Sequence, residues 1–370
     1  MAEHSKSDAD LPDRPLRRGW TTGACATAAT KAAFEALLTG VFPDPVEIVL
    51  PKGERPSFVL ASSALDGETA TAGIVKDAGD DPDVTHLATV IAAVRRLPAG
   101  SGVQFRAGPG VGTVTRPGLP IPPGEPAINP TPREMMREAI MEVAARCGGT
   151  PDAEITISIP NGVELAKQTW NPRLGIAGGL SILGTTGIVH PFSCSAWIAS
   201  IHRGIDVIRA AGLDHAAACT GSTSEAAVAR RYTLPDFAYI DMGDFAGGVL
   251  KYLRHHPIRR LTLAGGFGKI SKLAEGSLDL HSGRSQVNLD ALAAGALAIG
   301  ADAMLAKKLR HAHTAMEALE LAQAARLPLG DWVAERAREV AEAAADRKVE
   351  IELLIVDRGG QPVGHAGFHA

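Results

Sequence analysis

The acidic segment of residues 76–86, KDAGDDPDVTH, carries the side chains best suited to chemistry, because four aspartates and one histidine crowd together there. Carboxylate oxygens suit Mg²⁺ or Ca²⁺, although the glycine and final glutamate of an EF-hand loop are out of place. Asp77, Asp80 and His86 could instead transfer a proton as acid and base. In the simplest interpretation the segment is a solvated turn in which Asp83 caps a following helix. Like charges this close repel each other, so a cation, a lysine or a proton must intervene.

A second segment, residues 171–191, is dense in glycine. Glycine loses much conformational entropy on folding, so such a stretch needs a reason, such as a positive φ or the close approach of another group. We expect it to let a ligand approach bare backbone. Arginine and lysine lie in or near the glycine-rich stretches, and beside backbone donors they can clamp carboxylates. The candidate ligand-binding residues of this group are Arg18, Thr22, Arg173, Gly178, Gly179, Thr185, Thr186 and Lys269.

Two further turns place glycine directly after expected strands. At residues 219–225, exposed helix N–H groups would attract a carboxylate, and Ser222 and Glu225 have the spacing of a capping box. Residues 264–270 resemble a P-loop only superficially, because Leu263 and Ile270 stand where that motif needs glycine and a hydroxyl. A backbone nest that binds an anion is the alternative. The candidate contacts in these turns are Thr220, Gly221, Ser222, Gly265 and Gly266, and His281 is a candidate proton carrier.

The bulk properties exclude several classes of protein. The chain has 370 residues, of which 45% are hydrophobic and 21% charged, and its net charge is -4. It therefore lacks the basic surface of a nucleic-acid-binding protein. The four cysteines show no paired spacing, so we expect neither a zinc site nor a disulfide framework. The polar N-terminus and the aspartates in the most apolar window, residues 289–305, argue against a signal peptide and a membrane span. We expect a cytoplasmic protein.

The first half of the chain mixes strands and helices without strict alternation. Residues 1–15 are expected to form a disordered tail. The expected helices are 21–38, 84–97 and one that starts at Thr131 as N-cap, followed by Pro132 in its first turn. The expected strands are 46–50, 57–65, 69–75, 103–106, 112–115 and 155–159. This pattern predicts an α+β domain over residues 16–189.

From about residue 190 strands and helices alternate. Helices are expected at 196–211, from 222 onward, at 245–255 and within 289–345, and strands at 216–219, 237–240, 261–264 and 350–356. Such alternation predicts a parallel sheet with helices on both faces. We therefore predict a fold of class α/β with α+β, in which residues 190–370 form a Rossmann-like α/β domain. Ligands of such sheets bind beyond the carboxyl ends of the strands.

Five segments taken together resemble the CbiD family of cobalamin biosynthesis. They are LRRGWTTGACATAATKAA (16–33), VKDAGDDPDVTH (75–86), GVGTVTRPGLPIPPGEPAINPTPR (110–133), NPRLGIAGGLSILGTTGIVHP (171–191) and GGFGKISKLAEGSLDLHS (265–282). The similarity runs from about residue 16 past residue 290. It implies methylation at C1 of cobalt-precorrin-5B to give cobalt-precorrin-6A on the anaerobic branch of the pathway. S-adenosylmethionine would be the methyl donor and a cobalt-containing tetrapyrrole the acceptor.

The implied reaction assigns roles to the candidate residues. Acetate and propionate arms on the acceptor would explain arginines set among glycine turns, and an acidic group would favour the cationic donor. We expect donor binding at residues 219–225 and 241–248, and acceptor binding at 171–191 with the acidic segment. The cofactor-binding set is Thr220, Gly221, Ser222, Asp241, Asp244, Gly265 and Gly266. The catalytic set is Asp77, Asp80, His86 and His281.

Two other functions compete with methyl transfer. One is a non-catalytic protein that binds corrinoid intermediates and has no saturable affinity for S-adenosylmethionine. The other is a metal-dependent hydrolase or lyase built on the acidic segment, although no H-E-x-x-H or G-x-S-x-G motif supports it. We expect no nucleic-acid or membrane partner, and the oligomeric state is open, with a homodimer as the candidate.

Overall fold

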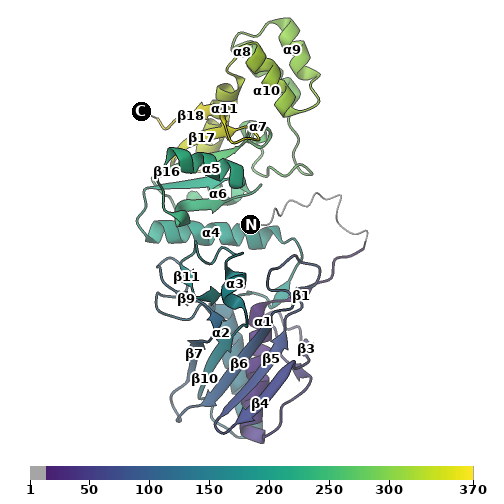
Figure 1. Ribbon diagram of the computed structural model, residues 1–370, viewed down its shortest axis with the longest axis vertical. Coiled ribbons are helices and arrows are strands. Elements are labelled where there is room, and N and C mark those ends of the chain that lie inside the picture. Colours follow the sequence, from purple (N-terminus) through teal and green to yellow (C-terminus); the bar gives the residue numbers. More distant parts are fainter. Residues whose placement is uncertain (1–13, 370) are drawn as a thin grey trace. The chain divides into compact units, whose positions relative to one another are not determined.

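The computed structural model describes residues 14–369, so the expected tail lies outside the described residues except for its last two positions. The chain divides into two compact units, Met1–Cys194 and Ser195–Ala370, and each has its own hydrophobic core (Figure 1). The mixed α/β class predicted from the sequence is confirmed. Among residues 14–369, no helix is both long enough and apolar enough to cross a membrane.

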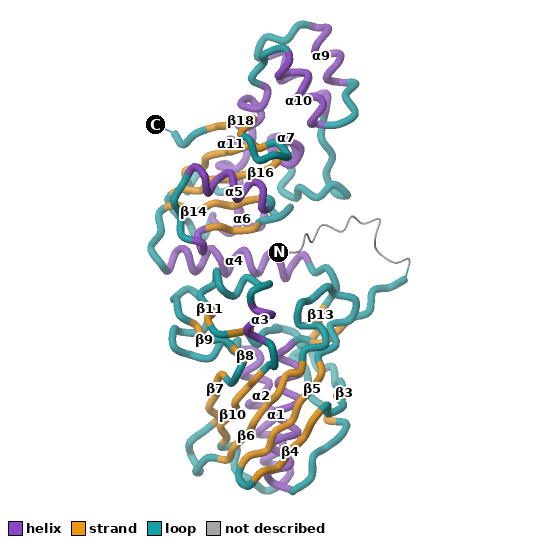
Figure 2. The backbone as a smooth tube through the Cα atoms, viewed as in Figure 1, coloured by secondary structure: helices purple, strands orange, loops and turns teal. Residues whose placement is uncertain are grey.

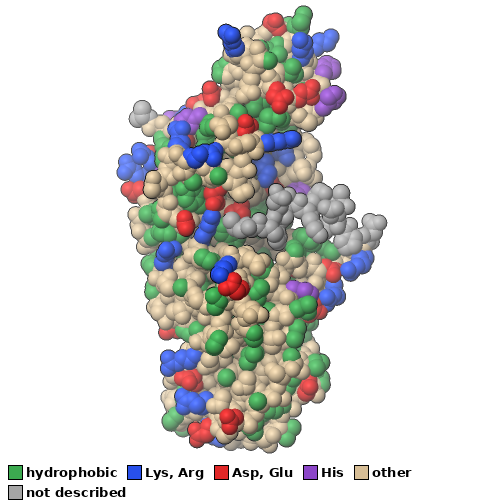
Figure 3. Space-filling model, viewed as in Figure 1, with side chains coloured by type: hydrophobic (Ala, Val, Ile, Leu, Met, Phe, Trp, Pro, Cys, Tyr) green, Lys and Arg blue, Asp and Glu red, His purple; other side chains and the backbone are tan. Residues whose placement is uncertain are grey.

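The first unit is built on a five-stranded sheet of order β4-β5-β6-β10-β7. Its strands are β4 (Ser62–Asp66), β5 (Thr69–Val75), β6 (Thr89–Arg96), β7 (Val103–Ala107) and β10 (Ala153–Ser158). All neighbours pair antiparallel except β10 and β7. Helices α1 (Thr22–Thr39) and α2 (Pro130–Cys147) cover one face. The opposite face carries mostly uncharged side chains, with charged ones at its margins (Figure 3).

Helix α1 follows the sequence prediction closely. The Thr21 hydroxyl accepts a hydrogen bond from the Ala24 N–H and caps the first turn. Gly40 ends the helix in the left-handed conformation, with φ of +79°. Its alanines are buried, and their small side chains let the helix pack closely against both the sheet and α2.

Two predictions for this unit are wrong. Residues 84–97 are not a helix: they contain the central strand β6, in which Val90, Ala92 and Val94 are buried and the residues between them are half-exposed. This period of two is that of a strand, so Asp83 has no helix to cap. Helix α2 begins earlier than expected, with Asn129 rather than Thr131 as N-cap. Proline is favoured in the first turn because it has no N–H to satisfy there, and Pro130 takes this place.

Short two-stranded ladders connect distant segments of the first unit (Figure 2). They pair β1 (Gly19–Trp20) with β13 (Ile188–Val189), β8 (Gly110–Val111) with β12 (Gly179–Leu180), β9 (Thr113–Val114) with β11 (Ile176–Ala177), and β2 (Val46–Glu47) with β3 (Ser57–Phe58). A short helix, α3 (Gly162–Ala166), precedes the glycine-rich segment. The first three of these ladders fold the glycine-rich segment back onto earlier parts of the chain.

The second unit contains a five-stranded sheet of order β15-β14-β16-β17-β18. Its strands are β14 (His215–Cys219), β15 (Tyr239–Asp241), β16 (Arg260–Gly266), β17 (Glu350–Val356) and β18 (Pro362–Ala366). The first four in this order are parallel, and β18, which the sequence analysis missed, is antiparallel to β17. The chain runs from β14 outward to β15 and then crosses to β16 on the other side. The strand order therefore reverses between β14 and β16.

Helices cover both faces of this sheet. Helix α5 (Ser222–Arg231) packs on one face through Ala227 and Val228. Helices α4 (Cys194–Ala210), α6 (Ala246–Leu253), α7 (Phe267–Ala274) and α11 (Leu329–Ala344) contribute to the core of the other face. The remaining elements are the 3₁₀ turn η2 (Asp236–Ala238) and helices α8 (Leu289–Ala298), α9 (Ala303–Arg310) and α10 (Ala315–Ala324). The expected capping box is absent, because Gly221 is the N-cap of α5 and Ser222 is already helical.

Candidate functional site

The acidic segment of the first unit is held by a buried ion pair. Lys76 is only 1% exposed, and its Nζ lies 2.6 Å from Asp83 Oδ2. The second carboxylate oxygen of Asp83 accepts hydrogen bonds from the Thr85 N–H and hydroxyl. Burial alone would raise the pKa of Asp83, but the charge of Lys76 and these hydrogen bonds outweigh it and lower that pKa. Asp83 is therefore a structural anchor for the segment.

Arginines that precede β1 neutralise the other carboxylates. The Arg17 guanidinium pairs with Asp77, and the Arg17 N–H donates to Asp80 at 2.7 Å. Arg14 also pairs with Asp80, at 3.1 Å. The hydrogen bond from the Arg17 side chain lowers the pKa of Asp77, and that from the Arg17 backbone lowers the pKa of Asp80. Both groups are thus held as carboxylates, which weakens them as proton carriers at neutral pH.

His86 belongs to the same cluster. Its Nδ1 accepts a hydrogen bond from the Ala78 N–H and lies 4.0 Å from the Asp77 carboxylate. Within residues 14–369 no group of three His, Cys, Asp or Glu side chains could hold a metal ion. Arg14, Arg17 and Lys76 therefore supply the positive charge that lets the aspartates lie close together.

Three of the sequence segments that share the family resemblance meet at this place. The Trp20 N–H donates to the Asp77 carbonyl at 2.7 Å, and the Phe192 N–H donates to the Asp81 carboxylate at 2.8 Å. The Thr22 hydroxyl accepts a hydrogen bond from the Leu183 N–H at 3.1 Å. Residues 14–23, the acidic segment and residues 183–192 therefore form one cluster, which we call the arginine–aspartate cluster.

The glycines of residues 171–191 serve mainly to bring parts of the chain together. A Cβ atom on Gly179 would lie 2.3 Å from the Gly110 backbone, one on Gly184 2.4 Å from the Thr21 hydroxyl, and one on Gly187 2.5 Å from Leu50. At Gly178 nothing lies within 4 Å of such an atom, although its φ of +84° favours glycine. Gly179 therefore has a packing reason to be glycine, because its close neighbour is Gly110.

The other candidates in the first unit have local partners. Arg18 lies 3.6 Å from Glu54, and the Arg173 guanidinium stacks 5.2 Å above the Trp170 ring. Thr186 accepts a hydrogen bond from the Ile188 N–H at 3.2 Å, and Thr185 is exposed. Lys269, which the sequence analysis grouped with these residues, belongs to helix α7 of the second unit.

In the second unit the candidates gather at the carboxyl edge of the sheet. Thr220 follows β14, Asp241 ends β15, and Gly265 and Gly266 end β16. The Thr220 N–H donates to Ala264 O at 3.0 Å, and Asp241 Oδ1 accepts from the Gly243 N–H at 3.2 Å. The structure therefore brings the predicted cofactor-binding residues to adjacent strand ends.

Two of these glycines have no internal reason to be glycine. At Gly221 and Gly266 no atom lies within 4 Å of an added Cβ. Their φ angles, 162° and −70°, are ones that other residues adopt. Gly265 differs, because its Cβ would lie 2.8 Å from the Thr220 side chain. Gly221 and Gly266 therefore leave space at the edge that a ligand could fill, next to the N–H groups that begin α5 and α7.

Charged side chains border this space. Lys269 Nζ lies 3.0 Å from Asp244 Oδ1 and donates to Thr220 O at 3.4 Å. Lys272 is only 7% exposed, and its Nζ donates to Leu280 O at 2.9 Å. Burial lowers the pKa of Lys272. The Leu280 N–H in turn donates to Asp244 O at 2.8 Å. We call this set of residues, Thr220, Asp244, Lys269, Lys272 and Leu280, the lysine–aspartate hub.

His281 directly follows this hub in the chain. Its Nδ1 accepts a hydrogen bond from the Gly283 N–H at 3.2 Å, and its own N–H donates to Asp279. Burial would raise the pKa of Asp279, but hydrogen bonds from Arg284 and from the His281 backbone outweigh it and lower that pKa. These contacts shape the turn that carries His281.

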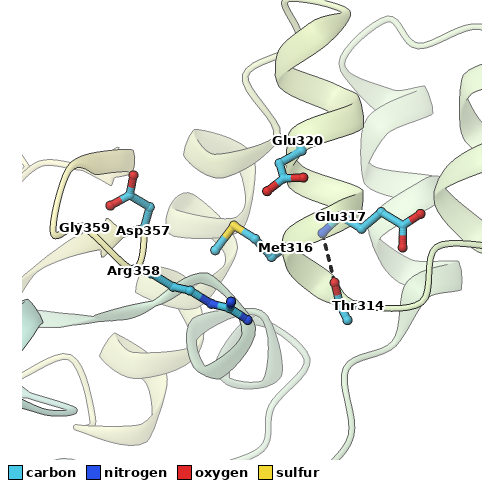
Figure 4. A pocket seen from close by; sticks show the side chains of 7 residues that line it. All are labelled: Thr314, Met316, Glu317, Glu320, Asp357, Arg358 and Gly359. Atoms are coloured by element: carbon cyan, nitrogen blue, oxygen red, sulfur yellow. Dashed lines mark hydrogen bonds between the residues drawn. The ribbon is translucent and has the colours of Figure 1, made fainter.

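A neighbouring pocket of about 350 Å³ lies where β17 ends (Figure 4). Met316 extends from α10 toward the turn between β17 and β18. Glu317 and Asp357 are used locally, since Glu317 accepts from the His313 N–H and Asp357 from the Gln361 N–H. The sequence analysis did not single out this pocket, although a polar DRGG turn after an apolar strand marks its position.

The roles of two lysines were not predicted from the sequence. A lysine was expected only as one group that could reduce the repulsion among the aspartates, and the full burial of Lys76 was not expected. Lys272 was given no site role, because one lysine of an amphipathic helix looks like any other until the segment packed against it is known. Both roles depend on partners several residues away in folded loops.

Comparisons with known proteins identify the family of the chain. A solved structure described as a cobalamin biosynthesis protein, CbiD, from Archaeoglobus fulgidus is 27% identical and covers 73% of this chain and 83% of its own, with a TM-score of 0.39. The CbiD family model matches residues 9–191, and the model of the CbiD C-terminal domain matches residues 279–367. Proteins named cobalt-precorrin-5B C(1)-methyltransferase from Brucella anthropi and Brucella canis are each 62% identical over 346 residues, 93% of this chain and 94% of the relative. From these family matches and this identity over nearly the whole length, the chain belongs to the CbiD family.

Proposed function

We propose that this chain transfers a methyl group to C1 of cobalt-precorrin-5B and gives cobalt-precorrin-6A in anaerobic cobalamin biosynthesis. The observation that carries this function is the 62% identity, over 93% of the chain, with relatives that bear this activity in their names. The chain is therefore a methyltransferase of cobalamin biosynthesis whose substrate is a cobalt-containing tetrapyrrole.

The methyl donor is S-adenosylmethionine, and it binds at the carboxyl edge of the sheet in the second unit, which we assign as a Rossmann-like domain of residues 190–370. Three features support this assignment. The strand order reverses between β14 and β16, and ligands of parallel sheets bind at such a switch point. Gly221 and Gly266 leave space there, and Asp241 stands at the end of β15, where a carboxylate can accept hydrogen bonds from ribose hydroxyls.

S-adenosylmethionine supplies an electrophilic methyl group on a sulfonium. The chain itself must hold donor and acceptor in line and exclude water, because positioning can lower the barrier to such a displacement by several kcal/mol. Thr220, Gly221 and Ser222 would hold the donor through the first turn of α5, with Gly265 and Gly266 opposite them. Asp241 and Asp244 would place negative charge near the sulfonium, and His281 is the candidate proton carrier of this unit.

The acceptor binds to the first unit, the α+β domain of residues 16–189. Arg18 and Arg173 are half-exposed or exposed and could take its carboxylates, while Thr22, Gly178, Thr185 and Thr186 lie in the segments beside them. The arginine–aspartate cluster gives this region charge of both signs. His86 is the candidate there for guiding a proton at the macrocycle, beside the arginine-paired carboxylates of Asp77 and Asp80.

The function is tested by anaerobic incubation of the purified chain with S-adenosylmethionine and cobalt-precorrin-5B, followed by mass spectrometry. The product should gain one methyl group, and isotope from a labelled methyl donor should appear in it. A tetrapyrrole that is bound but unchanged would instead identify a corrinoid-binding protein. Calorimetry with Asp241→Ala and Gly221→Val tests the donor site separately, since unchanged affinity in both variants rules it out.

A further inference from the structure

The lysine–aspartate hub places one positive and one negative side chain next to the space at the sheet edge. Lys269 reaches it from α7, after β16, and Asp244 from the loop after β15. Their charged atoms are 3.0 Å apart, and the lysine also reaches the Thr220 carbonyl after β14. The pair therefore joins the ends of three parallel strands on both sides of the switch point.

This ion pair keeps capacity to bind a further group. The Oδ1 atom of Asp244 is buried, yet among residues 14–369 it accepts no hydrogen bond of normal geometry. A buried carboxylate oxygen that accepts no hydrogen bond is costly, and the charge of Lys269, 3.0 Å away, offsets part of that cost. The Lys269 side chain is 38% exposed and its ammonium carries three donors, while the Asp244 side chain is 23% exposed. Both groups are therefore accessible to a ligand that carries charges of both signs.

The surrounding structure holds the backbone that carries Asp244. The Leu280 N–H donates to the Asp244 carbonyl, and Leu280 is 1% exposed. The Leu280 carbonyl accepts in turn from the buried Lys272. The next turn is also fixed, because the Gly247 N–H donates to Leu278 O at 2.8 Å. A carboxylate on a fixed backbone beside a partly exposed ammonium is suited to recognise a small charged ligand by position.

We propose that Asp244 and Lys269 recognise the amino-acid end of the methyl donor, with Asp244 binding its ammonium and Lys269 its carboxylate. An α-amino acid carries both charges on one carbon, so neighbouring side chains of opposite sign match them together. The proposal rests on the proposed function and assigns Lys269 to the donor, whereas the sequence grouped this lysine with the candidate contacts of the glycine-rich segment. Asp241 would bind the nucleoside part of the same molecule.

The test compares two ligands that differ only in this end. S-adenosylhomocysteine has the amino-acid group, and 5′-methylthioadenosine has the same nucleoside and a thioether without it. Calorimetry on the full-length chain measures both affinities for the wild type, Lys269→Met and Asp244→Asn. We expect each variant to lose about 10- to 100-fold in affinity for S-adenosylhomocysteine, which is the effect of one charge-assisted hydrogen bond. Affinity for 5′-methylthioadenosine should stay within about twofold.

Controls separate recognition from folding and from the choice of site. Lys307→Met removes an exposed lysine of α9 and should change neither affinity. Lys269→Arg keeps the charge and should restore part of the lost affinity. Equal loss for both ligands would overturn the proposal and make the pair a structural contact, as would unchanged affinity for S-adenosylhomocysteine. If Asp241→Ala and Gly221→Val also bind like the wild type, the donor site itself is misplaced.

Discussion

Glycine has two distinct uses in this chain, and they differ in what surrounds the missing side chain. In residues 171–191 most glycines face another part of the chain at a distance that excludes a methyl group, as Gly179 faces the Gly110 backbone. At the sheet edge of the second unit, Gly221 faces open space with an ordinary extended backbone. The first use is set by packing, whereas no packing contact explains the second, which is the position that we propose for a ligand.

Alanine substitution should separate these two uses. Gly179→Ala places a methyl group 2.3 Å from a backbone carbon, so it should destabilise the fold by about 1–3 kcal/mol or more. Gly221→Ala meets no atom, so its unfolding midpoint should match the wild type while its affinity for S-adenosylhomocysteine falls. Urea unfolding and calorimetry measure the two effects. A destabilised Gly221→Ala variant with normal affinity would show that packing explains this glycine too.

The buried pair of Lys76 and Asp83 is the residue contact on which the acidic segment most depends. Asp83→Asn leaves the lysine charge buried without its partner, which should cost about 3–5 kcal/mol at neutral pH. The pKa of Asp83 is lowered by folding, so its stabilising effect is complete above the unfolded value of about 3.9 and disappears as the pH falls through the lower folded value. The wild type and Asp83→Asn should therefore converge in stability only in acid.

Urea unfolding of both proteins between pH 3 and pH 7 checks this dependence. A matched control is the double variant Lys76→Met, Asp83→Leu, which removes both charges and should cost less than Asp83→Asn alone. If the difference between wild type and Asp83→Asn were the same at every pH, the contribution would come from shape and not from charge.

At the scale of elements, the sequence was sufficient where local signals agreed. Thr21, the alanine run and Gly40 predicted α1 almost to the residue, and the apolar run of Glu350–Val356 predicted β17. Strand β6 was mistaken for a helix because its alanines favour a helix and its alternation is short. What decides its state is pairing with β5 and β10 on both sides, which no local pattern contains.

The candidate sites were predictable to a similar extent. The strand ends of the second unit follow from the alternation of strands and helices, so the sequence placed Thr220, Asp241 and Gly266 within two residues of the observed strand ends. The contacts around these strand ends could not be predicted from the sequence. Lys272, for example, meets Leu280 only because the segment following α7 folds back. Nor could the sequence reveal that Arg14 and Arg17 neutralise the acidic segment some sixty residues away.

On the scale of the whole molecule, the binding sites that we propose for the methyl donor and for the acceptor belong to different units. The core of the first unit contains residues between Ala24 and Ile188, and the cores of the second contain residues between Ile201 and Ala366. Among residues 14–369, these cores share no residue between the two units. The lysine–aspartate hub and the three strand ends lie entirely in the second unit, whereas Asp77 and Asp80 lie in the first.

This division predicts the behaviour of a fragment of residues 192–370, which includes all of α4 and everything after it. Since its cores are complete, it should unfold cooperatively, and it should bind S-adenosylhomocysteine within about threefold of the full chain, a difference below about 1 kcal/mol. Thermal unfolding and calorimetry measure both properties, and Lys269→Met in the fragment should reproduce its effect in the full chain. A folded fragment with much weaker affinity would assign part of donor binding to the first unit, where Asp77 and Asp80 are the carboxylates that could stabilise a sulfonium.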